Sequence, residues 1–314
     1  MTSSAIETSG LRKSYGDKTV LAGIDLDVRE GTVFALLGPN GAGKTTTVAV
    51  LTTLARPDGG VVRVAGHDVV TDTRAVRAAI GVTGQFASVD DLLTGEENLR
   101  LMTDLHHLGR GAGGRVVAEL LERFDLVDAA RKPAATYSGG MRRKLDLAMT
   151  LVGRPRIIFL DEPTTGLDPR SRRAVWDTVR SLVADGTTIF LTTQYLEEAD
   201  QLADRIAVLD QGRLVAEGTA ADLKRQVPGS HVRLRFADVA DLGAAARLFG
   251  GSTRDDDALT LRVPGDGGVR SVRALLGRLD EHSVEVEEFS VHTPDLDDVF
   301  LALTGHPSTE EIAR

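Results

Sequence analysis

A glycine-rich stretch that ends in a lysine is the first part of the chain whose residue types and spacing could do chemistry. It fits the spacing G-x-x-x-x-G-K-[ST] and reads Gly38-Pro39-Asn40-Gly41-Ala42-Gly43-Lys44-Thr45-Thr46. Such glycines let a loop fold back so that backbone N–H groups point at phosphate oxygens. Lys44 would hold the β- and γ-phosphates of a nucleotide, and Thr45 would ligate Mg²⁺. The alternative, a glycine-rich turn with a chance lysine, is weakened by the strand predicted at 32–37 and the helix predicted at 45–54.

Two adjacent carboxylates follow an apolar run at 157–160, which is typical of a buried central strand. Open parallel sheets bind ligands at the carboxyl ends of their strands, so we expect these side chains beside the glycine-rich loop. Asp161 is placed to ligate Mg²⁺ directly or through water, because that ion prefers hard oxygen ligands. Glu162 is the candidate to polarise an attacking water. Taken alone, two acids after a strand are more often a loop start or a helix cap.

A third motif connects these residues with a known family. It reads Tyr137-Ser138-Gly139-Gly140-Met141-Arg142-Arg143-Lys144 and resembles the signature motif of ABC-type ATPases. With the glycine-rich loop, the carboxylates and the run at 163–169, the match covers residues 6 to 226. The resemblance implies the P-loop NTPase fold of an ABC cassette, with a mainly parallel sheet and a helical subdomain that carries the signature.

The same resemblance implies a homodimer that closes on ATP. Two ATP molecules would lie between the phosphate loop of one copy and the signature of the other. Ser138 and the N–H groups of Gly139 and Gly140 begin a helix, so they would form a second anion-binding end aimed at the γ-phosphate. Asp168 matches the aspartate that communicates across the dimer, and Tyr15 matches the aromatic residue that stacks on adenine.

Two glutamines also align with positions of the ABC-type pattern. Gln85 matches the glutamine whose loop touches both Mg²⁺ and the membrane partner. Gln194 stands where most members place a histidine that contacts the γ-phosphate. A glutamine amide donates a hydrogen bond but relays no proton near neutral pH, so we expect hydrolysis to depend more heavily on Glu162.

Several further segments narrow the resemblance. Residues 82–99, the run at 141–146, Gln194 with Tyr195, and residues 297–305 resemble the daunorubicin/doxorubicin-resistance type of ATP-binding subunit in actinobacterial antibiotic exporters. In this subfamily a glutamine at the position of Gln194 is ordinary. The resemblance implies a separate multi-pass permease of the ABC-2 type, a peripheral location at the cytoplasmic face of the membrane, and export of a hydrophobic drug-like compound. Export of a lipid, glycan or ion stays an alternative, as does a soluble ABC ATPase that acts on ribosomes or DNA.

Alternating strands and helices must position these residues. Apolar strands are predicted at 20–28, 32–37, 157–160, 187–191 and 205–209, with helices at 170–183 and 196–202. This alternation favours an α/β fold with a mainly parallel sheet covered on both faces. The turn formers at 226–230 predict a boundary between a nucleotide-binding domain at 1–226 and a small C-terminal α/β domain at 227–314.

The C-terminal domain is predicted to have strands at 232–236, 259–263 and 284–289 and helices at 239–249, 269–279 and 296–303. No constellation of polar residues in it suggests a pocket. We therefore expect it to contact the permease or the second copy rather than to sense substrate.

Composition and charge exclude several classes of function. The 314 residues are 42% hydrophobic and 26% charged, which is typical of a folded protein. The net charge of −9 repels phosphate polymers, so we expect no nucleic-acid partner. The absence of cysteine excludes disulfides, thiolate nucleophiles and cysteine-ligated metals. No apolar run approaches the roughly 18 residues of a membrane span.

Three other features are interpreted as structural. The histidines have no zinc-ligand spacing, so nucleotide Mg²⁺ is the metal we expect. The glycines at 109–114 favour a loop between helices. The Arg142-Arg143-Lys144 cluster most simply forms a solvated helix face, although behind the signature it could also balance phosphate charge.

Overall fold

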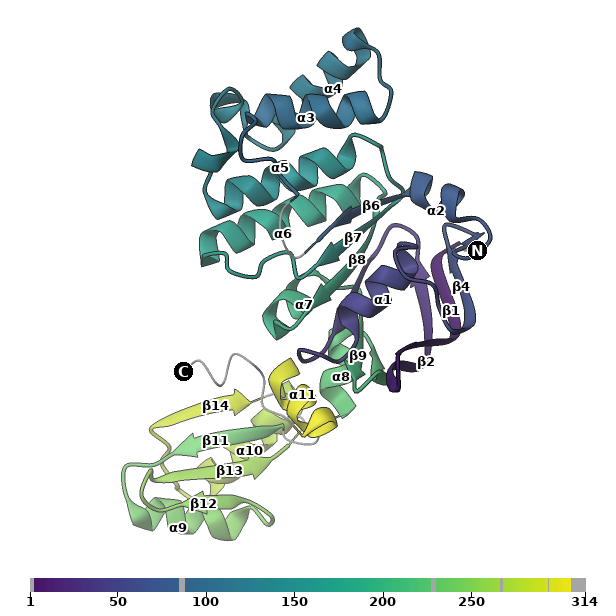
Figure 1. Cartoon of the computed structure of the whole chain (residues 1–314). Coiled ribbons are helices and arrows are strands. Elements are labelled where there is room, and N and C mark those ends of the chain that lie inside the picture. The colour runs from purple at the N-terminus through teal and green to yellow at the C-terminus, as the bar shows by residue number, and fades with distance from the viewer. Residues whose placement is uncertain (1–2, 85–87, 227–229, 266–267, 293, 306–314) are drawn as a thin grey trace. The chain divides into compact units, whose positions relative to one another are not determined.

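The computed structural model describes residues 3–84, 88–226, 230–265, 268–292 and 294–305 (Figure 1). These residues form two compact units divided between Ala220 and Ala221. The turn formers that predict the boundary come one short helix later, after α8 (Ala220–Gln226). Gln85 lies outside the described residues, and the other candidate site residues belong to the first unit.

The larger sheet of the first unit has six strands within the described residues. They are β3 (Val33–Leu37), β6 (Ile80–Thr83), β7 (Ile157–Asp161), β8 (Thr188–Thr193), β9 (Arg205–Asp210) and β10 (Arg213–Gly218). The strand order is β10-β9-β3-β8-β7-β6, and only the pairing of the edge strand β10 is antiparallel. The predicted α/β fold with a mainly parallel sheet is confirmed.

A second sheet in the first unit is antiparallel, and most of it was not predicted. Its strands are β1 (Ser4–Tyr15), β2 (Lys18–Arg29), β4 (Gly59–Val64) and β5 (His67–Asp68), in the order β2-β1-β4-β5. The helix α1 (Lys44–Leu51) shares one hydrophobic core with strands of both sheets. The glycine-rich loop therefore enters a helix that is buried between two sheets.

Helices on the other side of the parallel sheet carry the signature. In chain order they include α3 (Gly95–Leu105), α4 (Arg110–Arg123), α5 (Gly139–Leu151), α6 (Pro169–Ala184) and α7 (Leu196–Leu202). The helix α2 (Thr73–Ala79) is not among them, because its Val76 belongs to the core that α1 shares with both sheets. Short 3₁₀ turns, η1 (Val127–Ala129) and η2 (Ala134–Thr136), connect α4 to α5. Figure 1 shows α5 and α6 side by side, with α3 and α4 beyond α5.

Aromatic packing fixes the centre of the parallel sheet. Phe34, Phe159 and Phe190 lie on β3, β7 and β8 and are almost completely buried. Ring centroids are 5.6 Å apart for Phe34 and Phe190, and 5.5 Å apart for Phe159 and Phe190. Because helices and the second sheet cover both faces, these strands are continuous apolar runs rather than alternating ones. The ends of the three strands are thus held rigidly beside one another.

The prediction of a loop at the glycines of 109–114 is wrong. Gly109 is the N-cap of α4, and Gly111, Gly113 and Gly114 lie inside that helix. A Cβ on Gly113 would lie 3.0 Å from Oγ1 of Thr103 on α3. Small residues here allow α3 and α4 to approach closely, and this tertiary packing outweighs the low helix propensity of glycine.

The second unit contains a four-stranded antiparallel sheet within the described residues. Its elements are β11 (His231–Arg235), α9 (Val239–Leu248), β12 (Thr253–Asp255), β13 (Thr260–Pro264), α10 (Val269–Glu281), β14 (Glu288–His292) and α11 (Leu296–Thr304). The strand order β12-β13-β11-β14 is that of a split βαβ fold. Its core joins β11, β13, α9 and α10.

A cavity of about 670 Å³ in the second unit was not predicted. Its lining includes His231, Arg262, His292 and Asp298. His231 and His292 lie opposite each other on β11 and β14, with ring centroids 4.7 Å apart. The expectation that no constellation of polar residues forms a pocket in this domain is therefore wrong, because strand pairing brings together residues that are far apart in sequence.

Candidate active site

Three parallel strands end at one place and deliver the candidate residues to it. Leu37 pairs with Thr193, and Asp161 pairs with Thr192. The Gly38 N–H donates to the carbonyl O of Thr193 at 3.3 Å. The glycine-rich loop, the two carboxylates and the loop that carries Gln194 therefore leave the sheet at the same edge, as expected for an open parallel sheet.

The glycine-rich loop runs too close to neighbouring strands to carry side chains at two positions. A Cβ on Gly38 would lie 2.3 Å from the carbonyl O of Leu209, and one on Gly43 would lie 2.7 Å from Cδ2 of Leu21. Gly43 also has φ 112°, a left-handed conformation that favours glycine. The helix α1 begins directly after it, so the free N–H groups of the first turn lie at the loop.

A cavity of about 650 Å³ lies against this loop. Its lining from the loop and α1 comprises Pro39, Asn40, Gly41, Gly43, Lys44, Thr45 and Thr46. Lys18, Thr19 and Val20 of β2 line it as well, together with Glu162, Gln211 and Gly212. Gly38 and Ala42 are buried and do not line the cavity. The signature residues do not line it either.

Lys44 and Glu162 form a nearly buried ion pair in the cavity wall. The Nζ–Oε1 distance is 3.2 Å, and the side chains are 4% and 10% exposed. The Lys44 ammonium also donates to the carbonyl O atoms of Gly38 at 2.7 Å and Pro39 at 3.2 Å. Burial lowers the pKa of Lys44, while the charges of Glu162 and Asp161 oppose this. Glu162 itself has φ 48°, in the left-handed region.

Asp161 and Thr45 supply oxygen atoms suited to a magnesium ion. Asp161 is buried and accepts a hydrogen bond from the Thr192 hydroxyl, and Thr45 lines the cavity. The described residues contain no cluster of three or more His, Cys, Asp or Glu side chains able to hold a metal. A carboxylate and a hydroxyl fit Mg²⁺ when phosphate oxygens and water complete its coordination.

The signature residues begin α5 at a separate place in the first unit. Oγ of Ser138 accepts from the Met141 N–H at 3.2 Å and caps the helix. A Cβ on Gly140 would lie 2.6 Å from Oγ of Ser171 in α6. Glycine at this position therefore lets the first turns of α5 and α6 lie in contact.

Asp168 caps α6 in the same area. Its Oδ1 accepts from the N–H groups of Arg170 and Ser171, both at 3.0 Å, and its Oδ2 accepts from the Ser171 hydroxyl at 2.6 Å. The Ser171 hydrogen bonds hold the pKa of Asp168 below its usual range. Asp168 thus remains anionic near neutral pH while it caps the helix.

The remaining candidates lie around the cavity. Tyr15 ends β1 and is 53% exposed, with the Lys13 ammonium 5.1 Å from its ring centroid. Gln194 lies between β8 and α7, where the Tyr195 N–H donates to Oγ1 of Thr193 at 2.9 Å. Neither Tyr15 nor Gln194 lines the cavity.

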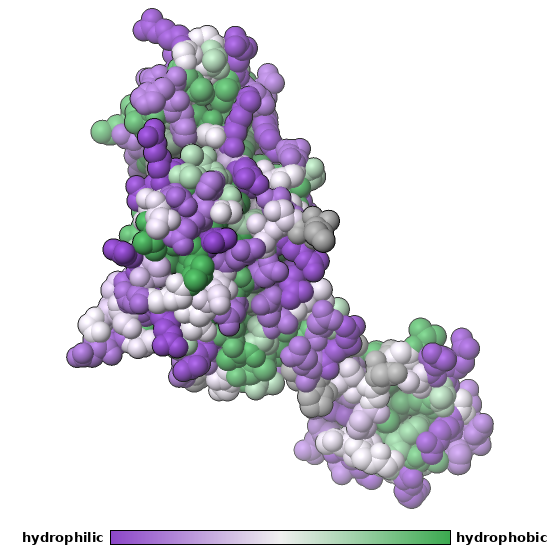
Figure 2. Space-filling model, turned by 90° about the vertical axis from the view of Figure 1, so that its right-hand side faces the viewer, coloured by the Kyte–Doolittle hydropathy of each residue, from purple (hydrophilic) through white to green (hydrophobic). Residues whose placement is uncertain are grey.

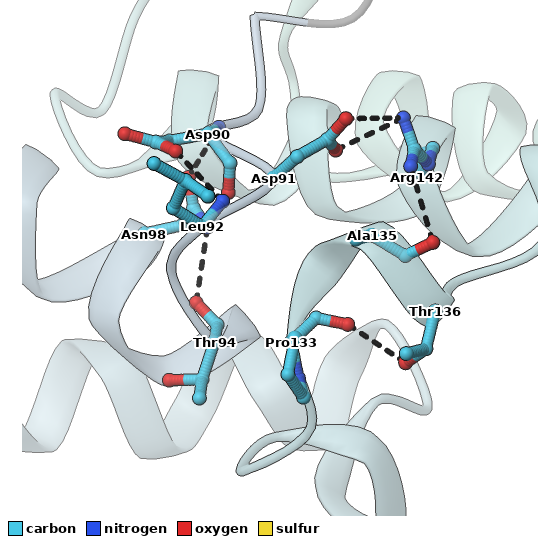
Figure 3. A network of polar contacts seen from close by, with 9 residues as sticks. All are labelled: Asp90, Asp91, Leu92, Thr94, Asn98, Pro133, Ala135, Thr136 and Arg142. Carbon is cyan, nitrogen blue, oxygen red and sulfur yellow. Dashed lines mark hydrogen bonds and ion pairs between the residues drawn. The ribbon is translucent and has the colours of Figure 1, made fainter.

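The segment that follows Gln85 ends in a tightly bonded turn (Figure 3). The Asn98 side chain accepts from the Asp90 N–H at 2.9 Å and donates to the carbonyl O atoms of Asp90 and Thr94, both at 3.0 Å. Asp91 pairs with Arg142 of α5 at 3.0 Å. Leu92 on this turn is 92% exposed. The turn is therefore rigid and presents a large apolar side chain to solvent.

Three buried charged residues near the site were not predicted. Arg143 and Asp146 form an ion pair in α5 at 3.2 Å, so the solvated helix face expected at Arg143 is wrong. Glu198 of α7 is completely buried and accepts from Nε1 of Trp176 at 3.1 Å. Burial raises the pKa of Glu198. The residues three and four positions away from these three are mostly glycine, polar or charged, so the 3.6-residue period gives no signal of their burial.

Comparisons with known proteins identify the family. The family model for ABC transporters matches residues 21–165. The daunorubicin/doxorubicin resistance ATP-binding protein DrrA of Streptomyces peucetius is 52% identical over 99% of this chain and 96% of its own. The Nod factor export ATP-binding protein I of Burkholderia orbicola is 37% identical over 97% of this chain and 98% of its own. A solved structure of the ATP-binding subunit of an ABC transporter has a TM-score of 0.63 at 30% identity, and the match covers 71% of this chain and 92% of that one.

No helix in the described part of the chain has the length and apolar character that a membrane crossing requires. On the face shown in Figure 2, hydrophobic residues form separate patches among hydrophilic ones. From its relatives and its fold, the chain belongs to the ATP-binding subunits of ABC transporters, which are ATPases, and within them to the daunorubicin/doxorubicin-resistance type.

Proposed function

We propose that two copies of this chain bind two ATP molecules head to tail and use their hydrolysis to drive export of a hydrophobic drug through a separate membrane permease. The observation that carries the proposal is the incompleteness of the cavity. It holds the phosphate loop and Glu162 but none of Ser138, Gly139 and Gly140. A second copy would supply those N–H groups at the outer side of the nucleotide.

The proposed roles follow from position. Backbone N–H groups of the loop and of Thr45 and Thr46 would bind phosphate oxygens, and Lys44 would bind the β- and γ-phosphates. Because Lys44 is held by Glu162 in the chain alone, the incoming phosphate would take over the ammonium and release the carboxylate. Glu162 would then accept a proton from the attacking water.

Other residues would complete the nucleotide site. Tyr15 would stack on the adenine ring, and Gln194 would donate a hydrogen bond to the γ-phosphate. Thr45, Asp161 and Gln85 would hold Mg²⁺, which neutralises charge on the β- and γ-phosphates when bound. Asp168 would communicate between the two copies.

The permease would dock where the bonded turn presents Leu92. An exposed leucine on a rigid turn loses little conformational freedom on binding, so its burial against a partner is favourable. This turn follows the loop of Gln85, so motion could pass between the permease and the nucleotide. The proposed location is therefore the cytoplasmic face of the membrane, with the chain bound peripherally.

A second candidate function changes only the cargo. The 37% identity to a Nod factor export protein over almost the whole chain supports the same ATPase with a different exported compound. Cargo contacts would lie in the permease in either case.

The test is a pull-down of tagged Glu162→Gln protein from membranes of the native host with Mg-ATP, followed by mass spectrometry. The expected result is a multi-pass permease, which can then be tested with daunorubicin. Recovery of ribosomal or DNA-repair proteins, or of the chain in the soluble fraction with no membrane partner, would refute transport and leave the ATPase intact.

A further inference from the structure

The helix that begins at the signature contacts the chain on both sides of Gln85. Nη1 of Arg143 donates to the carbonyl O of Gly84 at 2.9 Å, and the Ser88 N–H donates to Oδ1 of Asp146 at 3.0 Å. Arg143 and Asp146 also bond each other at 3.2 Å. One ion pair of α5 therefore holds the chain at Gly84 and at Ser88, on either side of residues 85–87.

A third contact continues this attachment at the surface (Figure 3). Arg142 pairs with Asp91 at 3.0 Å and donates to the carbonyl O of Ala135 at 3.4 Å. Both charged side chains are partly exposed, so this pair by itself contributes little. Three residues in the first two turns of α5 thus hold the segment at Gly84, Ser88 and Asp91. The side chains that make the two inner contacts, Arg143 and Asp146, are the buried ones.

Folding alone does not require charges at the inner positions. The Arg143 and Asp146 side chains are 6% and 4% exposed, and an apolar pair in such a place is often as stable as an ion pair. Burial lowers the pKa of Arg143 and raises that of Asp146, and the attraction between them opposes both shifts. Nε and Nη2 of Arg143 are buried without an acceptor among the described residues. The pair is thus costly, and its distinctive contribution is the attachment of the loop.

We propose that Arg143 and Asp146 are positioning residues that fix the loop carrying Gln85 to the signature helix, so that the two move together during the ATP cycle. The proposal rests on the proposed function, in which Gln85 contacts Mg²⁺ and the membrane partner. Neither Arg143 nor Asp146 lines the nucleotide cavity. Besides its contact with Gly84, the Arg143 charge also interacts with that of Asp161, and the combination with Gln85→Ala described below separates the two effects.

The double variant Arg143→Met/Asp146→Leu separates positioning from folding. Removing one charge would leave the other buried and unpaired, whereas the apolar pair fills a similar volume and removes both loop contacts. The matched control is Asp177→Leu/Arg180→Met. That pair has the same spacing in a helix and a 3.0 Å ion pair, but it is exposed on α6 and contacts no loop of the site.

Two measurements on the full chain report whether the segment around Gln85 is still held in place. Hydrogen–deuterium exchange of peptides spanning 84–92 should become about tenfold faster in the double variant, because the Ser88 N–H loses its buried acceptor. The Mg²⁺ concentration that half-saturates ATPase activity should rise about tenfold, as expected for loss of a residue that orients a metal ligand. Binding of ATP without Mg²⁺ and the melting temperature should stay as in the control.

The variant Gln85→Ala and its combination with the double variant complete the test. If the pair acts through Gln85, the triple variant has the same Mg²⁺ requirement as Gln85→Ala alone. The proposal would be overturned if the double variant had the hydrogen-exchange rate and the half-saturating Mg²⁺ concentration of the wild type. It would also be overturned if the rise in Mg²⁺ concentration in the triple variant were the product of the rises in Gln85→Ala and in the double variant. Failure of the proposed function is seen elsewhere, as the absence of a permease from the pull-down with tagged Glu162→Gln protein.

Discussion

The phosphate-loop half of the site and the signature half differ in how much of a binding site one chain can build. Lys44 and Glu162 are nearly buried, bonded to each other and placed by strand ends. Ser138, Gly139 and Asp168 are exposed and form the starts of two helices whose caps are already satisfied. The first half is a cavity, while the second is a surface, which the proposed dimer would complete into a site.

The difference also appears in the charge balance of each half. The phosphate-loop half contains its own carboxylate, which occupies Lys44 before ATP arrives. The signature half offers the N–H groups of a helix start, and Arg142 in the next turn is already paired with Asp91. Its attraction for a phosphate is therefore weaker and depends on close approach. We infer that ATP binds first to the cavity and then recruits the second copy.

Glu162→Gln has the largest expected effect and tests whether the phosphate-loop half contains the catalytic base. We expect ATP hydrolysis to slow by about 10²–10⁴-fold, the usual contribution of a general base. We also expect tighter ATP binding, because Lys44 loses its anionic partner. Phosphate release and fluorescent ATP titration measure the two effects.

The control for this variant is Glu30→Gln, which removes an exposed partner of Arg156. Unchanged ATP affinity in Glu162→Gln would mean that the Lys44–Glu162 pair does not compete with phosphate. Hydrolysis at the control rate would remove Glu162 from the role of base.

Mixing two inactive variants tests whether the halves come from different chains. Glu162→Gln disables the phosphate-loop half, and Gly140→Asp places a carboxylate and a clash with Ser171 at the signature half. In a head-to-tail dimer of one copy of each, one of the two composite sites is intact, so an equimolar mixture should regain about a quarter of wild-type ATPase. A mixture that stays as inactive as its components would contradict the head-to-tail arrangement.

Leu92→Glu asks whether the rigid turn beside the signature half is the permease surface. Burial of a leucine side chain is worth about 1.5–3 kcal/mol, so co-purification of the permease should fall by roughly tenfold or more. Leu54→Glu is the matched control, because Leu54 is also exposed, at 74%, and follows α1. Equal loss in both variants would argue against a specific surface.

Glu198→Gln has the smallest expected effect, which is on the stability of the fold that carries the phosphate-loop half. Burial raises the folded-state pKa of Glu198 above its ordinary value of 4.5. Below pH 4.5 the acid is neutral in both states, and stability is lost as pH rises through the folded-state pKa, because a buried charge must form. The variant should therefore melt a few degrees above wild type at pH 8 and equally at pH 4. A constant difference across this range would exclude ionisation as the cause.

Local motifs explain why much of the phosphate-loop half could be predicted. The residues at 38–46 are contiguous and lie between a strand and a helix, and the carboxylates follow an apolar strand, so sequence order alone places them at one sheet edge. The pairing of Lys44 with Glu162 is not visible in sequence, because it depends on strand order.

Features set by distant contacts escaped prediction. Arg143 belongs to a charged run, and only the packing of α5 against the segment at Gly84 and Ser88 buries it. Gly113 lies inside a helix, where the absence of a side chain leaves room for Thr103 of α3. In the second unit, His231 and His292 meet through strand register. In each case the decisive partner is far away along the chain, where periodicity gives no information.

The hairpin of β1 and β2 has a consequence for how such a protein can evolve. Tyr15 and the cavity residues at 18–20 belong to the antiparallel sheet, whereas Lys44 and Glu162 follow strands of the parallel one. The β1–β2 pairing contains several register shifts, and such irregularities re-aim the side chains beside them. Under the proposed function, substitutions in the hairpin can therefore change the contacts with the nucleotide base, while the residues that handle the phosphates stay in place.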